Sequence, residues 1–511
     1  MRVLRAPIHP LLFAAYAVLA LLASNVGQVR SSAAIRSVVI SLSVALVLLL
    51  LLRLVLADWA KAAAVGTIVL ILFFAYGHVY GFLKSVSLAG TVLGRHRYLL
   101  PAFLLSSVAA LWLIRRSSFW SGAAPFLNVM GAVSLLIPLA RVVGSEYRAV
   151  QEPERALPLE GGSTDSASLE LPDIYYIILD AYTRGDILRE NFDFSNEPFL
   201  NKLEELGFYV AECSQSNYSQ TDLSLASSLN IDYLHNLSDE FTADNDDRSA
   251  VFRLIRESMV RRTLEGLGYE IVAFETGFPW TELDDADHYL APEHDTSFFS
   301  PSLNSFEVLL LRTTAVSALI DASVAFFSNI SAGALEQHEA RVRYTLTQLS
   351  EIPRLPGPKL VFAHVVAPHK PYVFGSFDEA GPADPDPDPS EDPQAYVSGY
   401  RNQVMFVNEH MIELLQDIIE GSEPSPIIVL QGDHGADQAE PTSRVAILNA
   451  LRLPNVNADR LYPTISPVNT FRLVLAEYFG LDLGLIEDVS RYSDYEVPYD
   501  FFQIPNPCET P

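Results

Sequence analysis

The sequence predicts a multi-pass α-helical membrane anchor followed by an α/β domain with a mainly parallel central sheet. Three observations predict this fold class. Long apolar stretches fill the first 145 or so residues. The sign of the net charge reverses between this part and the rest of the chain. Beyond residue 172, short apolar runs alternate with helical patterns, as in domains with a parallel sheet covered by helices.

Charge separates the two parts most clearly. The first 150 residues hold 13 of the 34 Lys and Arg of the chain but only two of its 62 Asp and Glu, so their net charge is about +11 and that of the remainder about −39. A domain this acidic repels nucleic acid, and we therefore expect no nucleic acid partner. The simplest effect of the charge is to keep a large domain soluble.

The anchor, residues 1–148, is expected to contain about five helices. Its apolar stretches are Leu11–Val26, Val38–Leu56, Ala62–Leu83, Leu99–Ile114 and Ala123–Val143. A span needs about 20 apolar residues, and the first and fourth stretches are shorter, so four spans remain an alternative. The first stretch could also be a secretory signal, but no cleavage site of small residues followed by polar sequence supports this. A transporter is disfavoured because the stretches contain almost no acidic residue.

Orientation is not fixed by Lys and Arg, which lie on both sides of the predicted spans. Five spans with the N-terminus inside would put the acidic domain outside the cytoplasm. We expect a multi-pass protein of the cell membrane, and this topology is what the family resemblance described below implies. Residues 149–171 are rich in Pro, Gly, Ser and acidic residues, which is typical of a linker. The remaining residues, 172–511, are expected to form the second domain.

Three continuous apolar runs in this domain predict strands buried on both faces: Ile174–Leu179, Leu360–Val366 and Ile427–Leu430. Helical patterns lie between them at Phe199–Leu206, Val251–Leu267, Glu336–Ser350 and Tyr400–Glu420. A polar cluster follows each strand, and these clusters contain Asp180, His369 and Asp433-His434. Ligands of open α/β sheets bind beyond the carboxyl ends of the strands, so we expect these side chains to meet at one edge.

Two other features leave alternatives open. The two cysteines, Cys213 and Cys508, permit at most one disulfide, and the sequence does not tell whether they pair. Residues 378–393 form a Pro/Asp-rich segment that cannot build a core, and we interpret it as a surface loop near the site. Its Pro spacing matches no calcium-binding loop.

Asp433 and His434 are the most informative pair of residues. A carboxylate and an imidazole at the end of a strand can ligate one divalent cation, although such pairs also serve as turn residues and helix caps. Asp180 offers a second carboxylate from an adjacent strand, or it could cap the helix that begins near Arg184.

Hydroxyl residues crowd the start of a predicted helix near Asp222. Thr221 would lie where free N–H groups and the helix dipole favour an anion, and a bound metal would activate its hydroxyl as a nucleophile. Simple capping by Thr221 or Ser219 is the alternative. Of the rival residues, Thr183 is expected to cap a helix, and His364, inside a buried strand, is expected to be a core or supporting residue rather than a ligand.

Together these motifs resemble the sulfatase and alkaline phosphatase superfamily. The shared features, in order, are the strand-ending acid (Asp180), the hydroxyl-rich helix start, His-x-Pro-aromatic (residues 369–372) and Asp-His-Gly (residues 433–435). The membrane-anchored type, which includes lipoteichoic acid synthases and phosphoethanolamine transferases, is the more similar. The resemblance covers residues 172–480 and matches the anchor in kind only.

The resemblance implies the role of each residue. Asp180, Thr221, Asp433 and His434 would be the metal ligands, Thr221 would also be the nucleophile, and His369 would hold the phosphate or donate a proton. The cofactor would be one divalent ion, Mn or Zn rather than Ca. The function implied is transfer or hydrolysis of a phospho-head group on a cell-envelope lipid or glycan at the membrane. A catalytically silent domain that binds a surface glycan or protein is one alternative.

Sulfuric ester hydrolysis is the second alternative, and the sequence disfavours it. Neither cysteine lies in the C/S-x-P/A-x-R motif that sulfatases mature to formylglycine. The His and Asp residues are also too few, in the required order, for a two-zinc site of the alkaline phosphatase kind. We therefore expect a site with one metal and a Thr nucleophile.

Overall fold

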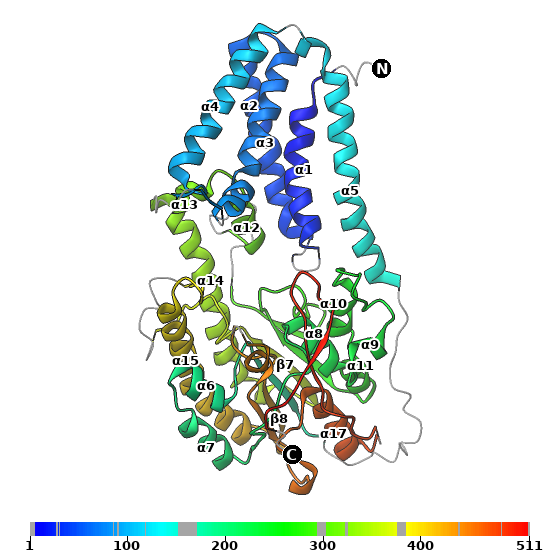
Figure 1. Ribbon diagram of the computed structural model, residues 1–511. Helices are drawn as coiled ribbons and strands as arrows, with labels where there is room; N and C mark the ends of the chain where they lie inside the picture. The colour runs from blue at the N-terminus through cyan, green and yellow to red at the C-terminus, as the bar shows by residue number, and fades with distance from the viewer. Residues whose placement is uncertain are drawn as a thin grey trace. The chain divides into compact units, whose positions relative to one another are not determined.

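The computed structural model describes residues 6–26, 29, 31–84, 86–88, 91–117, 119–151, 171–293, 303–321, 325–375, 385–437, 440–481 and 483–508. The chain divides into two compact units (Figure 1). The first consists of Met1–Gln151 and His294–Ala334, and the second of Glu152–Glu293 and Leu335–Pro511. Nearly all of the predicted linker, residues 152–170, lies outside the described residues.

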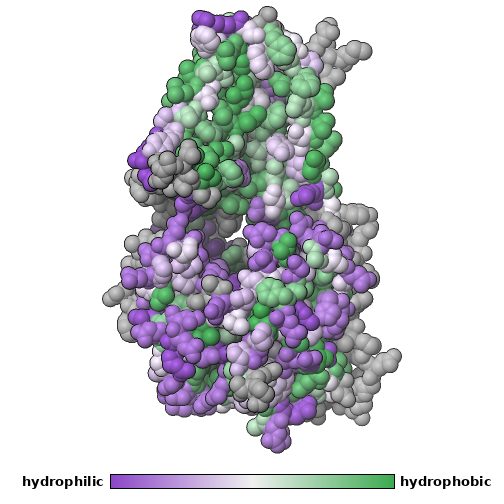
Figure 2. All heavy atoms as spheres, viewed as in Figure 1, coloured by the Kyte–Doolittle hydropathy of each residue, from purple (hydrophilic) through white to green (hydrophobic). Residues whose placement is uncertain are grey.

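The first unit is built on five apolar helices among the described residues, each on a predicted stretch. They are α1 (His9–Ser24), α2 (Ile35–Leu56), α3 (Trp59–Lys84), α4 (His96–Arg116) and α5 (Ala124–Gln151). In the described part of the chain, α2 to α5 are long and apolar enough to cross a membrane, whereas α1 has only 16 residues. Apolar side chains dominate the face of these helices seen in Figure 2, as expected of a surface that contacts lipid.

A later part of the chain also belongs to this unit. Helix α12 (Ser305–Thr313) begins with a capping box between Asn304 and Glu307, and α13 (Ser317–Asp321) follows. The side chain of Glu307 also forms an ion pair with Arg36. Apolar side chains of α12 pack against α1, so burial holds the segment there. The predicted boundary at residue 172 had put this segment in the second domain, because sequence patterns do not reveal contacts between distant segments.

The second unit contains a sheet that, within the described residues, has seven strands in the order β4-β9-β8-β3-β7-β5-β6. The predicted strands are β3 (Ile174–Leu179), β7 (Lys359–Val365) and β8 (Ile427–Gly432), and they lie side by side and parallel. The parallel strands β5 (Glu270–Phe274) and β6 (His288–Leu290) extend one edge, and the other edge carries β9 (Asn449–Arg452), antiparallel to β8, and β4 (Tyr209–Val210). The predicted α/β fold with a mainly parallel sheet is confirmed.

Helices cover both faces of this sheet (Figure 1). Every residue of β3 is buried, and its alternate side chains enter two different apolar clusters. One cluster contains side chains of α6 (Gly185–Phe192), α7 (Glu197–Glu205), α14 (Ala325–Leu349) and α15 (Pro393–Gly421). The other contains side chains of α8 (Thr221–Leu229), α10 (Ser249–Arg256), α11 (Met259–Gly266) and α17 (Pro467–Phe479). The face of this unit seen in Figure 2 is mostly polar.

Two sequence predictions need refinement. The pattern Val251–Leu267 predicted one helix, but the chain forms α10 and α11, because Ser258 accepts a hydrogen bond from the N–H of Arg261 and starts a new helix. In the Pro/Asp-rich segment, residues 378–384 lie outside the described residues. The part that is described leads into α15, which Asp392 caps.

Candidate active site

Three neighbouring strands bring potential ligands to one edge of the sheet. Asp180 directly follows β3, Asp433 directly follows β8, and His364 lies near the end of β7. Strands β7 and β8 flank β3 and run parallel to it, with Ile178 opposite His364. The site therefore lies at the carboxyl ends of the strands, where ligands of open α/β sheets bind.

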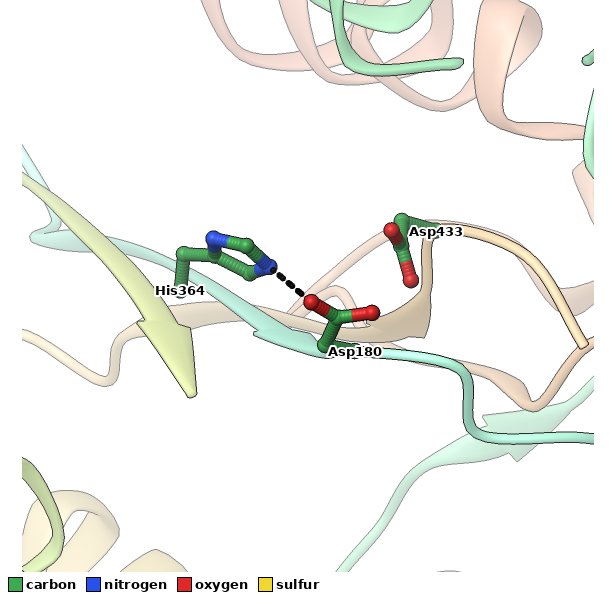
Figure 3. Close-up of side chains that lie close together, drawn as sticks. All are labelled: Asp180, His364 and Asp433. Carbon is green, nitrogen blue, oxygen red and sulfur yellow. Dashed lines mark ion pairs between the residues drawn. The ribbon is translucent and has the colours of Figure 1, made fainter. Parts of the chain in front are cut away.

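Asp180, His364 and Asp433 form a compact buried group (Figure 3). One ligand atom from each lies within 4.8 Å of the others, and the Nε2 atom of His364 is 3.3 Å from Oδ2 of Asp180. Three buried atoms of this group have no hydrogen-bond partner among the described residues: Oδ1 of Asp180, Nε2 of His364 and Oδ2 of Asp433. The group could hold a metal ion.

The surroundings of this group leave those atoms available to bind a cation. The N–H of Ala181 donates to Oδ1 of Asp433 at 2.9 Å, and this leaves Oδ2 available. The hydroxyl of Thr281 lies 3.1 Å from Nδ1 of His364, so a proton on Nδ1 leaves the lone pair on Nε2. Two buried carboxylates are costly without compensation, and a divalent cation would provide it. Oxygen and imidazole donors suit Mn or Zn.

His434 connects the carboxylates to Thr221. Its Nδ1 atom lies 2.8 Å from the carbonyl of Gly435, so Nδ1 donates and Nε2 carries the lone pair. That Nε2 atom is 3.6 Å from Oδ1 of Asp180 and 3.5 Å from Oδ2 of Asp433. It is also 3.1 Å from Oγ1 of Thr221. The four residues predicted as metal ligands thus lie together.

Thr221 is the first residue of α8, and its hydroxyl does not cap the helix. The capping position is Gln220, in an extended conformation and without a side-chain capping bond. The hydroxyl faces His434 instead. Asp222, in the first turn, forms a 2.6 Å ion pair with Arg248, which offsets a negative charge that would repel an anion. The start of α8 therefore retains the positive character that favours anion binding.

The C-terminal segment fixes the stretch of chain before Thr221. A disulfide joins Cys213 to Cys508, which answers the question of pairing that the sequence left open. Strand β10 (Ser490–Tyr492) pairs with β11 (Phe502–Ile504), and hydrogen bonds join this hairpin and the residues after it to the same stretch. These bonds run from Arg491 N to Asn217 O (3.0 Å) and from Gln220 Nε2 to Ser493 O (3.0 Å). They limit the movement of the helix start.

The electrostatics suit metal ligation. Burial would raise the pKa of Asp180, but His369, His364 and His434 outweigh it and hold that pKa well below the usual value. Burial, together with the charge of Arg444, lowers the pKa of His434, so its imidazole is neutral at physiological pH. Burial opposes the charged form of His364, but contact with Asp180 raises its pKa. The Asp180 carboxylate is therefore charged, and the neutral His434 ring carries a lone pair on Nε2, toward which the Thr221 hydroxyl points.

His369 lies beside this group rather than within it. Its backbone N–H donates to the carbonyl of Asp180 at 3.0 Å. Its Nδ1 atom is 2.5 Å from the carbonyl of Lys370, and its ring centroid is 6.2 Å from that of His434. The loop after β7 thus holds the imidazole next to the cluster.

Two expectations about neighbouring residues differ from the structure. The predicted cap, Thr183, caps no helix: Arg184 is the capping residue of α6, and the Thr183 hydroxyl donates to the carbonyl of Ala446 at 3.0 Å. His364, expected to support the core, is instead a further candidate ligand. A polar residue near the end of an otherwise apolar strand was the signal, but only the strand order reveals that it faces Asp180.

Comparison with known proteins gives structural matches alone. No family model matches the chain, and no curated protein matches its sequence. Lipooligosaccharide phosphoethanolamine transferase A from Neisseria meningitidis is 12% identical, with a TM-score of 0.43, over 93% of this chain and 95% of that one. The zinc complex of the periplasmic domain of EptC from Escherichia coli is 13% identical, with a TM-score of 0.40, over 64% and 91%.

A third match is the lipoteichoic acid synthase LtaP from Listeria monocytogenes, which is 13% identical with a TM-score of 0.36, over 64% of this chain and 76% of that one. These are the kinds of protein that the sequence resembles. Since these TM-scores are below 0.5, the case for function rests on the residues of the site.

Proposed function

We propose that the protein is a membrane-anchored, metal-dependent enzyme that transfers or hydrolyses a phospho-head group of a cell-envelope lipid or glycan through Thr221. One observation carries the proposal. The Thr221 hydroxyl lies at a helix start, 3.1 Å from a His434 nitrogen that also contacts Asp180 and Asp433. A hydroxyl nucleophile beside potential metal ligands is an arrangement that supports phosphoryl transfer through a covalent intermediate.

The residues present fit one divalent ion. Asp180, Asp433, His434 and Thr221, with His364 as a further candidate, would hold Mn or Zn. Buried atoms without partners support Asp180, Asp433 and His364 in this role. His434 is included because its Nε2 atom lies near both carboxylates, and Thr221 because its hydroxyl contacts His434. When bound, the ion would favour the ionised form of the Thr221 hydroxyl and stabilise negative charge on the transferred group.

The helix start would bind the transferred group. The backbone N–H groups of Thr221 and Asp222, at the start of α8, would donate to an anion bound next to Thr221, whereas the N–H of Leu223 already donates to Oδ1 of Asp222. The ion pair between Asp222 and Arg248 offsets the negative charge of this carboxylate, which would otherwise weaken anion binding at the start of α8. Thr221 is thus both the attacking group and part of the anion-binding helix start.

His369 is suited to move a proton. Because its Nδ1 atom faces the Lys370 carbonyl, the proton stays on Nδ1 in the neutral ring, and Nε2 can accept or, when protonated, donate. We assign to Nε2 the delivery of a proton to the oxygen of the leaving alcohol. Deprotonation of water or an acceptor alcohol in the second half of the reaction would use the same atom.

The catalytic unit is proposed to lie outside the cytoplasm, with the N-terminus inside. The disulfide between Cys213 and Cys508 supports this, because disulfides persist in oxidising compartments. Protease added to intact spheroplasts should remove the unit. Protection until lysis would contradict the topology and, with it, a substrate in the outer leaflet.

The test of the activity is a search for the covalent intermediate. The full-length protein, loaded with Mn or Zn in detergent, is incubated with total membrane lipid and quenched in acid. Intact mass and peptide mapping should find a phospho-adduct on Thr221 and about one metal ion per chain. A protein with neither metal nor adduct would be the silent binding domain, two metal ions would indicate a phosphatase-like site, and turnover of a sulfate ester alone would exclude phosphoryl transfer.

A further inference from the structure

Arg444 is the one cation that reaches the His434–Thr221 contact in the part of the chain described here. It belongs to the short helix α16 (Pro441–Val445). Its Nε atom donates to the carbonyl of Ser219 at 3.0 Å, and Nη1 donates to the carbonyl of Gly435 at 3.2 Å. These bonds fix one edge of the guanidinium between the stretch before Thr221 and the loop that carries His434.

The other edge of the guanidinium faces the site. Its Nη2 atom lies 3.4 Å from Nε2 of His434, the same nitrogen that Thr221 approaches to 3.1 Å. One imidazole lone pair cannot serve a metal, a hydroxyl and a guanidinium at the same time. If His434 ligates a cation, the Nη2 protons of Arg444 are released toward a group bound at Thr221. An Arg side chain that is 16% exposed is a strong anion ligand.

A pocket with a volume of about 440 Å³ borders Arg444, and its lining also includes Ser219, Gln220 and Asp437. Arg444 thus borders this pocket and also contacts the group of candidate ligands through His434. Asp437 forms an ion pair with Nη1, so Nη2 is the atom that approaches His434. An anion held by Nη2 would lie next to Thr221, and the adjoining pocket could accept the rest of its molecule.

We propose that Arg444 binds a non-bridging oxygen of the phosphoryl group at Thr221, and that this contact makes the site select a phosphate ester over a neutral carboxylic ester. The inference rests on the proposed function, since it takes Thr221 as the point of attack. Planar guanidinium donors match the oxygens of a phosphate, whereas a neutral ester offers no charged oxygen to the Nη2 protons. Arg444 is therefore a specificity-determining residue. It also joins the stretch before Thr221 to the loop that carries His434 through its hydrogen bonds to Ser219 and Gly435.

A purely structural role must be separated from this one, and Arg184 provides the matched control. It is a buried arginine that holds the same stretch of chain: its Nη1 atom donates to the carbonyl of Ser214 at 3.0 Å, and its Nε atom pairs with Asp186 at 2.7 Å. Both bonds lie away from His434 and Thr221. Arg184→Gln and Arg444→Gln thus remove similar internal bonds, but only the second removes a donor from the site.

The experiment measures binding of inorganic phosphate to the full-length, Mn-loaded protein by calorimetry, together with metal content. Arg444→Gln should weaken phosphate binding by about 10- to 100-fold, the loss expected for one charge-assisted hydrogen bond, with metal content unchanged. Arg184→Gln should bind phosphate within about 3-fold of the wild type, even if its stability falls. Equal affinity of Arg444→Gln and wild type, or equal losses in both variants, would overturn the inference.

Two further outcomes keep the test decisive. If Arg444→Gln does not fold, Arg444→Lys replaces it: the lysine keeps the charge but cannot hold two carbonyls and an anion together, so affinity should fall by about 10-fold. Unchanged affinity would again overturn the role of Arg444. A wild-type protein that takes up metal and forms the Thr221 adduct while Arg444 variants bind phosphate normally would refute this inference and leave the proposed function standing.

Discussion

Replacing Thr221 by Ala should abolish turnover without unfolding the protein. The substitution removes the hydroxyl that faces His434, and no capping bond is lost, because Gln220 occupies the capping position. The cost in stability should be at most about 1 kcal/mol, the value of one ordinary hydrogen bond. Loss of a covalent nucleophile should lower turnover by roughly 10³-fold or more.

Thr183→Ala is the matched control, a second hydroxyl close to the end of β3. Its hydroxyl is fully buried and donates to the carbonyl of Ala446, which also accepts from the N–H of Arg184 at 3.3 Å. Because that carbonyl keeps one partner, the loss should stay near 1 kcal/mol rather than the larger penalty of an unsatisfied buried group. We expect Thr183→Ala to keep substantial activity.

The assay compares both variants with the wild type. Circular dichroism and urea unfolding report the fold, elemental analysis reports the metal, and hydrolysis or transfer of a fluorescent phospholipid reports turnover. The Thr221→Ala variant should be folded, retain some metal and lack both turnover and adduct. If Thr221→Ala is active and Thr183→Ala is not, the assignment of the nucleophile is wrong even though the fold is as described.

Three further predictions concern the metal and the stability of the second unit. Asp433→Asn should lower bound Mn or Zn well below one ion per chain in elemental analysis, and an unchanged content would exclude it as a ligand. Lys359→Met should cost about 3 kcal/mol in urea unfolding, because it leaves the half-buried carboxylate of Asp173 without its 2.5 Å ammonium partner. Adding Asp173→Leu should recover most of this loss, and no recovery would show that the pair does not set stability. Cys213→Ser should lower stability by about 2–4 kcal/mol relative to the protein with the Cys213–Cys508 disulfide. Reduction of the disulfide in the wild type should lower stability by the same amount. A smaller loss of stability would show that breaking the disulfide gives the unfolded chain little additional conformational freedom.

Local pattern was enough to predict much of the fold. Strand β3 has the predicted bounds, and β7 and β8 differ from their predictions by a few residues, because a continuous apolar run is typical of a strand buried on both faces. Helices α1 to α5 fall on the five apolar stretches for a similar reason. The polar residues after the strands predicted that Asp180, Asp433 and His434 meet, and the resemblance to a known family added Thr221 from the start of a helix.

The sequence alone could not predict which distant segments of the chain contact one another. Whether His364 faces the core or Asp180 depends on β7 lying next to β3, and nothing local encodes that neighbour. Arg444 was not predicted for the same reason, since an arginine in a short helix gives no sign that its Nη2 atom reaches His434. Helix α12 packs with the anchor because its apolar side chains are buried against those of α1. Periodicity determines which residues are buried, and only the tertiary structure decides against what they are buried.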